Sequence, residues 1–328
     1  MKKFLKNLAK VLAVFIFEIA YILGLGIYLI YYTDIFTTTR DMIVTTSMTT
    51  MTHQYFATWF LSDEKINEIL ASNKLTNSDS EEQSSLADVE ITEKEEDNSG
   101  SKEGIEVIPI ETDTFNAYLM IVDDPSRVEL ATCPDIGVVG ATTSQIVEYY
   151  GAIAGINAGG LADDAAGTGA DPTGLTMVNG QYYGPVNQYQ YYSLCGFTQD
   201  HKLYISDSIN KATLDTLNLR CAVSFGPALI VNGVPRIGGG GGWGIHPRTC
   251  IAQRQDGTVL FLVIDGRQKG SVGATLKHAQ DILLNYGAYN AFNLDGGAST
   301  TMVFDGALVN NPSDIAGERY VPTAFIVK

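Results

Sequence analysis

Apolar and polar positions divide the 328-residue chain into three stretches of different character. Residues 11–32 are almost wholly apolar, and as a helix this run is long enough to cross the roughly 30 Å hydrocarbon core of a membrane. Residues 73–104 are acidic and contain few large apolar side chains. From residue 105 onward, short apolar or alternating runs are separated by glycine, asparagine and aspartate, which is typical of β-strands joined by turns.

The first ten residues contain four lysines, whereas almost no basic residue directly follows the apolar run. Because positive residues stay on the cytoplasmic side, this asymmetry predicts a cytoplasmic basic tail over residues 1–10 and a transmembrane signal-anchor helix over residues 11–32. A cleaved signal peptide is the alternative, but it requires a shorter apolar core and a small-residue cleavage site. We therefore expect a single-pass protein of the cell membrane, with the rest of the chain outside the cell.

Residues 33–72 are predicted to form a helical stalk, and residues 73–104 an acidic flexible linker that cannot bury enough apolar surface to fold. Within the stalk, four side chains share one face of a helix over residues 40–60: Met48, Met51, Tyr55 and Trp59. This face could lie on the membrane, pair with another chain, or pack on the main domain. Ser62 then caps a short helix that begins with Asp63 and Glu64.

Residues 105–328 are predicted to fold as one domain. Strands are expected over residues 105–110, 115–122, 127–131, 152–156, 291–294 and 320–327, and four turns separate further hairpins: Asn179-Gly180, Asp200-His201, Asn232-Gly233 and Asp256-Gly257. Thr142 and Thr275 are each positioned to cap a helix, ended by Gly151 and Gly287 respectively. The fold class is therefore α+β, with a mixed and largely antiparallel sheet, a few packed helices and the preceding transmembrane helix.

The formal net charge of −16 and the lack of a basic stripe argue against nucleic acid as a partner. The four cysteines show no C-x-x-C spacing, which argues against a metal site of that type. Outside the cell a disulfide is expected, and Cys195 with Cys221 is the most plausible pair, whereas Cys250 lies in a core-strand context. The sequence does not indicate an oligomeric state.

Three aspartates lie among small residues in the loop over residues 161–174: Asp163, Asp164 and Asp171. A calcium loop is one interpretation, but the EF-hand spacing is absent, and a mobile rim loop is the other. We expect no cofactor and no catalytic metal, with a structural divalent cation such as calcium as the alternative.

The segment over residues 291–306 concentrates the candidate chemistry. A short buried strand ends at Asp295, and Gly296 and Gly297 then allow a tight turn. Ser299 and Thr300 follow directly, so hydroxyl and backbone N–H donors can converge near a carboxylate. A plain Asp-Gly-Gly turn is the alternative interpretation.

A glycine-rich loop over residues 236–248 carries Trp243. It lacks the Lys-Ser/Thr of a phosphate-binding loop. A flap whose Trp243 stacks on a sugar and a plain hairpin tip remain the two interpretations.

Four blocks, in order, resemble the motifs of the phosphodiester glycosidase family: GINAGG at 155–160, HPRT at 246–249, VIDGR with SVGAT at 263–275, and NLDGGASTTMV at 293–303. The resemblance extends from about residue 106 to the C-terminus. Leu161 stands where the family has an aromatic residue, and Ala298 where it has a third glycine. Residues 105–328 are thus expected to be a phosphodiester glycosidase domain that acts on a carbohydrate phosphodiester substrate.

The resemblance implies hydrolysis of the bond between a sugar's anomeric carbon and a phosphodiester oxygen. Asp295 is then the candidate nucleophile or general base and Asp265 the second catalytic carboxylate, although Asp265 could instead form a turn and pair with Arg267. Arg248 is the candidate phosphate clamp or else pairs with a structural acid. Further residues are expected to bind substrate: Asn157, Gly159, Gly160, Trp243, His246, Gly296, Gly297, Ser299 and Thr300. His246 could equally be structural.

The resulting hypothesis is a membrane-anchored extracellular glycosidase that cleaves sugar-1-phosphodiester bonds, of the N-acetylglucosamine-1-phosphodiester type, in cell-envelope or exopolysaccharide metabolism. The alternative is a non-catalytic carbohydrate-binding or assembly module for exopolysaccharide, because Leu161 and Ala298 depart from the family pattern. Multiple turnover of a sugar phosphodiester distinguishes the two.

Overall fold

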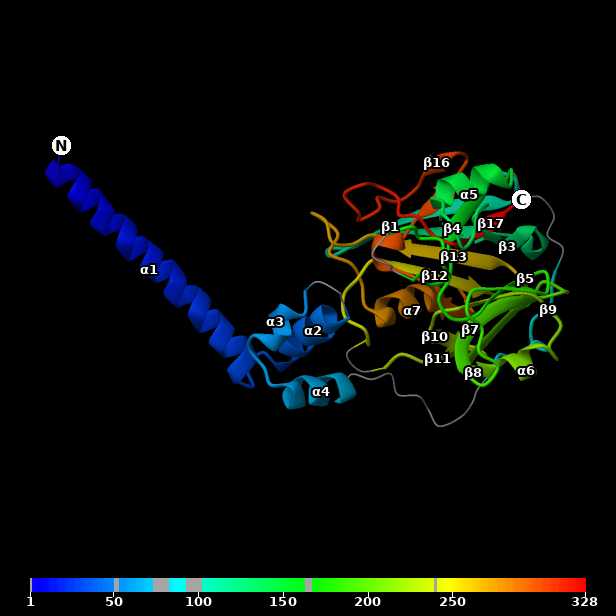
Figure 1. Cartoon of the computed structure of the whole chain (residues 1–328), viewed down its shortest axis with the longest axis horizontal. Helices are drawn as coiled ribbons and strands as arrows, with labels where there is room; N and C mark the ends of the chain where they lie inside the picture. Colours follow the sequence, from blue (N-terminus) through cyan, green and yellow to red (C-terminus); the bar gives the residue numbers. More distant parts are fainter. Residues whose placement is uncertain (1, 50–52, 73–82, 93–101, 163–166, 239–240) are drawn as a thin grey trace. The chain divides into compact units, whose positions relative to one another are not determined.

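A computed structural model describes residues 2–49, 53–72, 83–92, 102–162, 167–238 and 241–328 (Figure 1). The chain divides into two compact units, a helical unit over Met1–Lys74 and a globular unit over Leu75–Lys328. Each unit has its own set of buried apolar residues.

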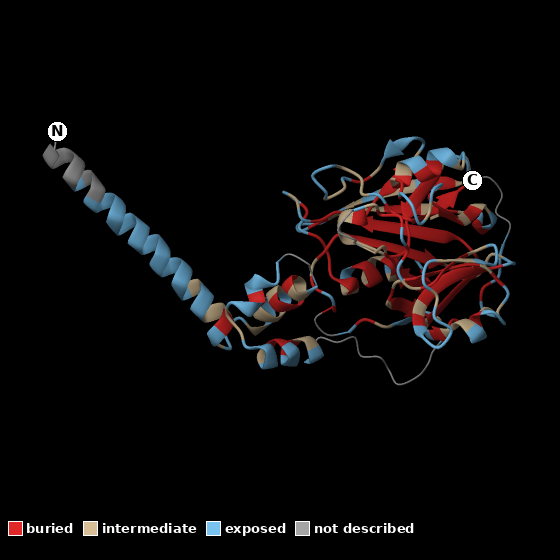
Figure 2. Cartoon of the chain, in the orientation of Figure 1, coloured by how far each residue is buried: buried red, intermediate tan, exposed pale blue. Residues whose placement is uncertain are grey.

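The helical unit begins with α1 (Lys2–Tyr32), a helix that continues through the expected membrane span. Its stretch Lys10–Tyr32 is long and apolar enough to cross a membrane, a property that signal sequences share. Most apolar side chains of this stretch are exposed, as the pale blue of α1 in Figure 2 shows, whereas Tyr31 near its end is buried. No other helix in the described part of the chain meets the criterion.

Three short helices complete this unit: α2 (Thr37–Met48), α3 (Tyr55–Thr58) and α4 (Asp63–Ser72). The single helix expected over residues 40–60 was wrong, because α2 already ends at Met48. Thr49 there turns its hydroxyl back to the carbonyl of Thr45 at 2.9 Å, a local bond that competes with helix propagation. The cap at Ser62 is confirmed, since its Oγ accepts from the backbone N–H of Lys65 at 3.3 Å.

The globular unit contains three sheets, and every strand pairing among the described residues is antiparallel. The seven-stranded sheet has the order β1 (Ile105–Glu111), β2 (Asn116–Val122), β13 (Val259–Ile264), β12 (Arg248–Gln253), β14 (Asn290–Asn293), β10 (Ala228–Val231), β11 (Val234–Pro235). The second sheet has the order β16 (Ala307–Leu308), β15 (Met302–Phe304), β4 (Ala154–Asn157), β17 (Thr323–Val327), β3 (Val128–Thr132). The third has the order β6 (Gln181–Tyr183), β5 (Thr176–Val178), β9 (Leu219–Ser224), β7 (Tyr191–Thr198), β8 (Leu203–Asn210).

The helices α5 (Thr143–Tyr149), α6 (Lys211–Leu214) and α7 (Leu276–Asn285), with 3-10 turns at η1 (Pro125–Arg127) and η2 (Gly297–Ser299), complete the unit. The α+β class is confirmed. The expected caps are present, since Thr142 and Thr275 each accept a bond from the third residue of their helix. All four hairpin turns lie between paired strands, as their Asn-Gly, Asp-Gly and Asp-His sequences indicate.

The core lies on both faces of the seven-stranded sheet, whose central strands are red throughout in Figure 2. On one face Phe261 and Phe292 join Phe197 and Phe325 from the other two sheets. On the other face Leu260 and its neighbours in the sheet pack against the apolar side of α7. This double burial holds the ends of β12, β13 and β14 in a fixed arrangement.

Residues 83–92, which the sequence analysis assigned to the flexible linker, lie on the globular unit. Ser84 pairs with Ile205 through two hydrogen bonds of 3.0 and 2.8 Å, and Val89 is fully buried. The N–H of Glu90 donates to the carbonyl of Gln255 at 2.8 Å. A few apolar side chains and backbone hydrogen bonds thus suffice to hold this acidic stretch on the globular unit. The rest of the expected linker, residues 73–82 and 93–101, lies outside the described residues.

The expected Cys195–Cys221 disulfide is wrong. The two residues lie on β7 and β9, but Cys195 is opposite Val223 and Cys221 is opposite Phe197. Such diagonal neighbours are about 7–8 Å apart, which exceeds the usual Cα separation of about 4.4–6.8 Å in a disulfide. All four cysteines are free and buried, and Cys250 lies in the core as expected.

Candidate active site

The four motif blocks meet where β12 begins. The carbonyl of Pro247 accepts from the N–H of Gly297 at 3.0 Å, and the carbonyl of Thr249 accepts from Leu294 at 2.8 Å. On the other side, His246 and Ala274 exchange two backbone hydrogen bonds. Because β12 runs antiparallel to β13 and β14, its start adjoins their ends, and the antiparallel register therefore brings these blocks together.

Asn157 connects this cluster to the second sheet. Its amide Nδ2 donates to the carbonyl of Asp295 at 2.7 Å, and its Oδ1 accepts from Thr249 Oγ1 at 2.8 Å and from the N–H of Thr301 at 3.1 Å. The side chain is fully buried and uses both ends on the protein itself. Asn157 therefore fixes the backbone of Asp295, whose own N–H donates to the carbonyl of Ala158 at 3.0 Å.

The carboxyl group of Asp295 lies in a partly enclosed environment at the start of the η2 turn. Burial raises its pKa from 3.8 to about 6, against the opposing effects of the Ser299 hydroxyl, Arg319, the Gly296 backbone and Arg267. A carboxyl group with such a pKa is ionised at neutral pH yet takes up a proton readily, as acid–base chemistry requires.

Two buried hydroxyl groups follow Asp295 in the same turn. Ser299 and Thr300 are each 1% exposed. The Ser299 hydroxyl acts on the Asp295 carboxyl group and lowers its pKa. Thr300 Oγ1 lacks a hydrogen-bond partner among the described residues. A buried polar atom without a partner is rare in native proteins, so Thr300 needs an explanation.

Arg267 lies on the other side of the turn. Its backbone has a φ of +60°, and its Nη2 lies 3.3 Å from Nδ1 of His246. A Cβ atom at Gly297 would lie 3.3 Å from the same guanidinium nitrogen, so the glycine lets the guanidinium approach the turn. The pKa of Arg267 is lowered by burial and by Arg319 and is raised by Asp295, which places these three charges near one another.

His246 is 7% exposed, and its pKa is lowered to about 3 by burial, by Arg248 and by Arg267. The imidazole is therefore neutral at physiological pH. Since an arginine can only donate, Nδ1 of His246 is the acceptor of the bond from Arg267. The ring orients the guanidinium and adds no positive charge of its own.

Arg248, the expected phosphate clamp, lies inside the protein with 4% exposure. Its Nε donates to the carbonyl of Ala274 at 3.0 Å, and its Nη2 donates to the carbonyls of Trp243 and Gly244 at 3.2 and 2.7 Å. These contacts tie the glycine-rich loop to the SVGAT block.

Asp265 also has internal partners. Its carboxylate accepts from Asn310 Nδ2 at 3.0 Å and from the N–H of Asn311 at 3.1 Å, and burial raises its pKa. Asn310 in turn donates to the carbonyl of Thr300 at 3.1 Å. Asp265 thus supports the loop that carries Thr300, and these bonds take the place of the alternative pairing with Arg267.

The glycines of the blocks occupy positions without room for a side chain. A Cβ at Gly159 would lie 2.3 Å from Val223 Cγ2, and one at Gly160 would lie 2.5 Å from Thr173 Oγ1. A Cβ at Gly296 would lie 2.6 Å from the carbonyl oxygen of Pro247. These three positions allow the segments of the site to pack directly on one another.

Trp243 is 37% exposed, and its ring meets Phe225 edge-on at a centroid distance of 6.2 Å. Its backbone has a φ of +49° and its carbonyl accepts from Arg248, so the described part of this loop has a defined conformation. Residues 239–240 of the same loop lie outside the described residues.

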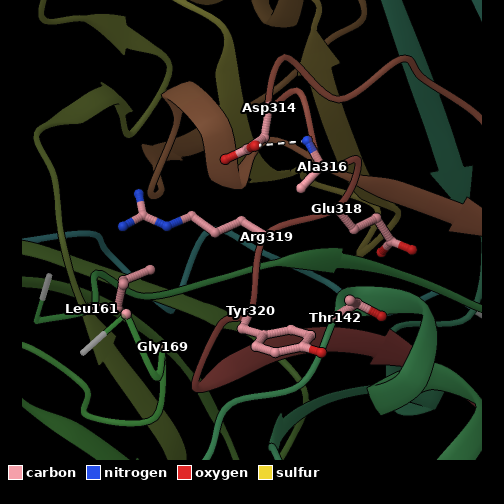
Figure 3. A pocket seen from close by; sticks show the side chains of 9 residues that line it. Thr142, Leu161, Gly169, Asp314, Ala316, Glu318, Arg319 and Tyr320 are labelled. Atoms are coloured by element: carbon pink, nitrogen blue, oxygen red, sulfur yellow. Dashed lines mark hydrogen bonds between the residues drawn. The ribbon is translucent and has the colours of Figure 1, made fainter. Parts of the chain in front are cut away.

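A cavity of about 640 Å³ opens beside Arg319. Figure 3 shows Arg319 between Leu161 and Asp314, with Tyr320 and Thr142 on a neighbouring wall. Arg319 also lowers the pKa of Asp295, although the described residues that line the cavity do not include Asp295 itself. Asp171 is exposed, whereas Asp163 and Asp164 lie outside the described residues, and no cluster of three potential metal ligands occurs in the described part.

The structure thus groups Asp295, Ser299 and Thr300 as expected, and it adds Arg267 and Arg319. Arg267 follows the VIDG sequence directly, and that position could have identified it. Arg319 lies in an irregular segment outside the four blocks, and no sequence signal pointed to it.

Comparison with known proteins finds a matching family and several relatives. A family model described as phosphodiester glycosidase matches residues 150–328. The SPbeta prophage-derived uncharacterized protein YomE of Bacillus subtilis (strain 168) is 33% identical over 138 residues, which are 40% of this chain and 21% of that protein. The bovine N-acetylglucosamine-1-phosphodiester alpha-N-acetylglucosaminidase is 39% identical over 70 residues, which are 21% of this chain and 13% of that enzyme. The chain thus spans only about a fifth or less of these relatives.

Solved structures support the fold. The zebrafish N-acetylglucosamine-1-phosphodiester alpha-N-acetylglucosaminidase catalytic domain, auto-inhibited by its pro-peptide, matches with a TM-score of 0.56 and 19% identity, over 70% of this chain and 85% of that one. A Burkholderia pseudomallei protein provisionally described as exported matches with a TM-score of 0.50 and 18% identity, over 65% of this chain and 74% of that one.

Proposed function

The chain belongs to the phosphodiester glycosidase family, and on this premise we propose that it hydrolyses a sugar-1-phosphodiester. In this reaction the bond between the anomeric carbon and the phosphodiester oxygen breaks, and a water oxygen bonds to the carbon. The phosphate leaves as a monoester on the remainder of the substrate. N-acetylglucosamine is the first sugar to test, because the bovine and zebrafish relatives carry it in their names.

The observation that carries this proposal is the environment of Asp295, a carboxyl group with a pKa of about 6 that two arginines influence. At pH 7 such a group is ionised about ten to one. The ionised form can attack the anomeric carbon or remove a proton from the attacking water. We assign Asp295 this role, as nucleophile or general base.

We assign the binding of the phosphate group to Arg267 and Arg319 instead of Arg248. The guanidinium of Arg248 is occupied by three backbone carbonyls, whereas Arg267 is only partly buried and lies against the Gly297 turn. Guanidinium groups bind phosphate oxygens in a bidentate manner, and two of them would stabilise the charge of the leaving phosphate. The neutral imidazole of His246 would accept a hydrogen bond from Arg267 and so keep its planar guanidinium group in a fixed orientation.

The remaining site residues divide into those that face substrate and those that position others. The hydroxyl of Thr300, which lacks a partner within the described residues, is assigned to the sugar or phosphate oxygens, and so is the hydroxyl of Ser299, which acts on Asp295. Asn157 and Asp265 are assigned positioning roles, because their polar atoms bond to the protein. Gly159, Gly160 and Gly296 serve close packing.

The cavity beside Arg319 is assigned to the substrate. At about 640 Å³ it has the size of an ordinary small-molecule site, which spans roughly 300–1,000 Å³. Leu161 supplies an apolar wall, and the exposed part of the Trp243 ring would stack on a sugar outside this wall.

We further propose that α1 anchors the chain in the cell membrane, with the globular unit outside the cell. The support is the apolar stretch Lys10–Tyr32 together with the lysines that precede it. An enzyme held there would meet phosphodiester-linked sugars of the cell envelope or of exopolysaccharide.

The test uses the full chain in detergent with N-acetylglucosamine-1-phosphodiesters, and free sugar is measured. Asp295→Asn is expected to abolish release, and Arg267→Ala to lower kcat/KM at least about 100-fold, as expected for removal of a transition-state contact worth about 3 kcal/mol. The exposed Asp113→Asn is the matched control. Undiminished release by Asp295→Asn would refute the assignment, whereas tight glycan binding without turnover would favour the binding-module alternative.

A further inference from the structure

We propose that the helical unit docks on the membrane surface through an aromatic collar, defined as Tyr28, Tyr32, Tyr55, Phe56 and Trp59. The partner is the headgroup region of the bilayer that α1 crosses. This inference rests on the proposed membrane anchor and adds a second, peripheral contact to it.

The collar side chains are large and exposed. Trp59 is 74% exposed, Tyr32 57%, Tyr28 56%, Phe56 46% and Tyr55 36%. On α3 the ring of Tyr55 lies 4.5 Å from Phe56 and 5.1 Å from Trp59, centroid to centroid, so these three rings form one surface. A contiguous aromatic surface of this kind marks an interaction site in a native protein.

The collar lies at the end of the apolar helix because Tyr31 joins α1 to α3. The hydroxyl of Tyr31 donates to the carbonyl of Phe56, and its ring stacks on Phe60 at 4.6 Å. Tyr31 is 7% exposed, so this joint is buried. On α1 itself, Tyr28 and Tyr32 stack on each other at 6.1 Å.

This position coincides with the interface of a bilayer crossed by Lys10–Tyr32. Tyrosine and tryptophan concentrate at membrane interfaces, because their rings are apolar while their O–H and N–H groups remain hydrated. The joint at Tyr31 holds α3 at the same level as the end of the span. The surface is therefore continuous with the membrane-spanning helix.

Charge along the unit supports the same orientation. Residues 33–61 contain only three charged side chains, Asp34, Arg40 and Asp41, and the last two pair at 3.1 Å. By contrast, α4 begins with Asp63 and Glu64, and its Ile66 and Ile69 pack inward on Val44 and Ala57. After α1, the unit thus concentrates its charge on α4 and leaves the segment that carries the aromatic rings of α3 nearly uncharged.

The test follows Trp59 fluorescence in the full chain carrying Trp243→Phe, which leaves one tryptophan. The protein is reconstituted into phosphatidylcholine vesicles that contain lipids brominated at shallow or deep acyl positions. A blue-shifted emission that shallow bromines quench more than deep ones, and that iodide quenches weakly, is expected.

A matched control carries the sole tryptophan on the globular unit, as Tyr189→Trp with Trp59→Phe and Trp243→Phe. Tyr189 is 82% exposed, so its replacement should be quenched by iodide and not by lipid. The proposal is overturned if Trp59, like this control, is quenched by iodide and not by the brominated lipids. If the chain then still resists alkaline extraction, the membrane anchor itself is retained. Protection of Trp59 from both quenchers would also overturn the proposal, because a protein surface would then cover the collar. Release of the chain by alkali would overturn the anchor itself.

Discussion

The Asp295→Asn variant is expected to be inactive yet more stable than the wild-type chain at pH 7.5. Burial raises the pKa of Asp295 from 3.8 to about 6, so the folded protein binds this proton more tightly than the unfolded chain does. The carboxyl group therefore stabilises the fold when protonated. Its contribution falls as the pH rises from about 4, and it is lost above about pH 6.

The size of the effect follows from the same two values. A difference of one pKa unit corresponds to about 1.4 kcal/mol, so a rise from 3.8 to about 6 costs the ionised folded state about 3 kcal/mol. The side chain is partly exposed, and solvent screening reduces this to about 2 kcal/mol. Asparagine has nearly the same shape and no charge, so it removes this penalty at neutral pH. Functional sites commonly trade stability for activity in this way.

Urea unfolding at several pH values between 4 and 8 measures the effect, with Trp243 emission as the probe in a Trp59→Phe background. The stability gain of Asp295→Asn should be about 2 kcal/mol at pH 7.5 and should vanish near pH 4. The exposed Asp113→Asn should leave stability unchanged at every pH. A gain that is absent, or that does not depend on pH, would refute the buried-carboxylate reasoning.

Four other predictions follow from the site. As Asp295 ionises, kcat/KM should increase about tenfold per pH unit below pH 6 and level off above it, as a pH–rate profile would record. Asn157→Ala leaves three buried polar groups without partners and should cost about 3 kcal/mol in urea unfolding. Gly296→Ala places a Cβ 2.6 Å from a carbonyl oxygen and should cost about 2 kcal/mol, whereas Ala298→Gly in the same turn should cost less than about 1 kcal/mol. Arg248→Lys keeps the charge but loses the fork that holds three carbonyls, and it should lower the unfolding free energy by about 2 kcal/mol.

Three of these predictions have a clear opposite outcome, and for the fourth an Asn157→Ala variant with unchanged stability would contradict the described bonds. A flat pH profile across pH 6 would remove Asp295 from the acid–base role. Equal costs for Gly296→Ala and Ala298→Gly would mean that the turn is not packed as described. An Arg248→Lys variant with unchanged stability but a greatly increased KM would return Arg248 to the role of phosphate clamp.

Local signals in the sequence predicted the elements well because the physics of turns and caps is local. The Thr142 cap is one example, since its partner Gln145 lies three residues away and nothing distant is needed. The turn at Asp295 was predicted for the same reason, because an apolar strand followed by two glycines determines the turn on its own. The helix over residues 40–60 failed where local threonine bonds opposed the apolar pattern.

The partners of side chains could not be predicted, because they depend on the register of distant strands. Arg248 and Asp265 carry charges suited to catalysis, but their neighbours in the fold are carbonyls and asparagine groups. The same limit applies to Cys195 and Cys221, whose strands pair with a two-residue offset. Arg319 could not be predicted either, because it comes from an irregular segment near the C-terminus that no motif marks.

The hydrogen bonds of Asn157 also determine when during folding this site can exist. They connect residues 92, 138 and 144 positions apart in the sequence, and they join the second sheet to the seven-stranded one. Contacts of such long range form late, because the loops between them must close first. During refolding, catalytic activity should therefore return with the slowest phase, after the hairpins have formed. The rate at which enzyme activity returns would then report the rate at which the two sheets dock during refolding.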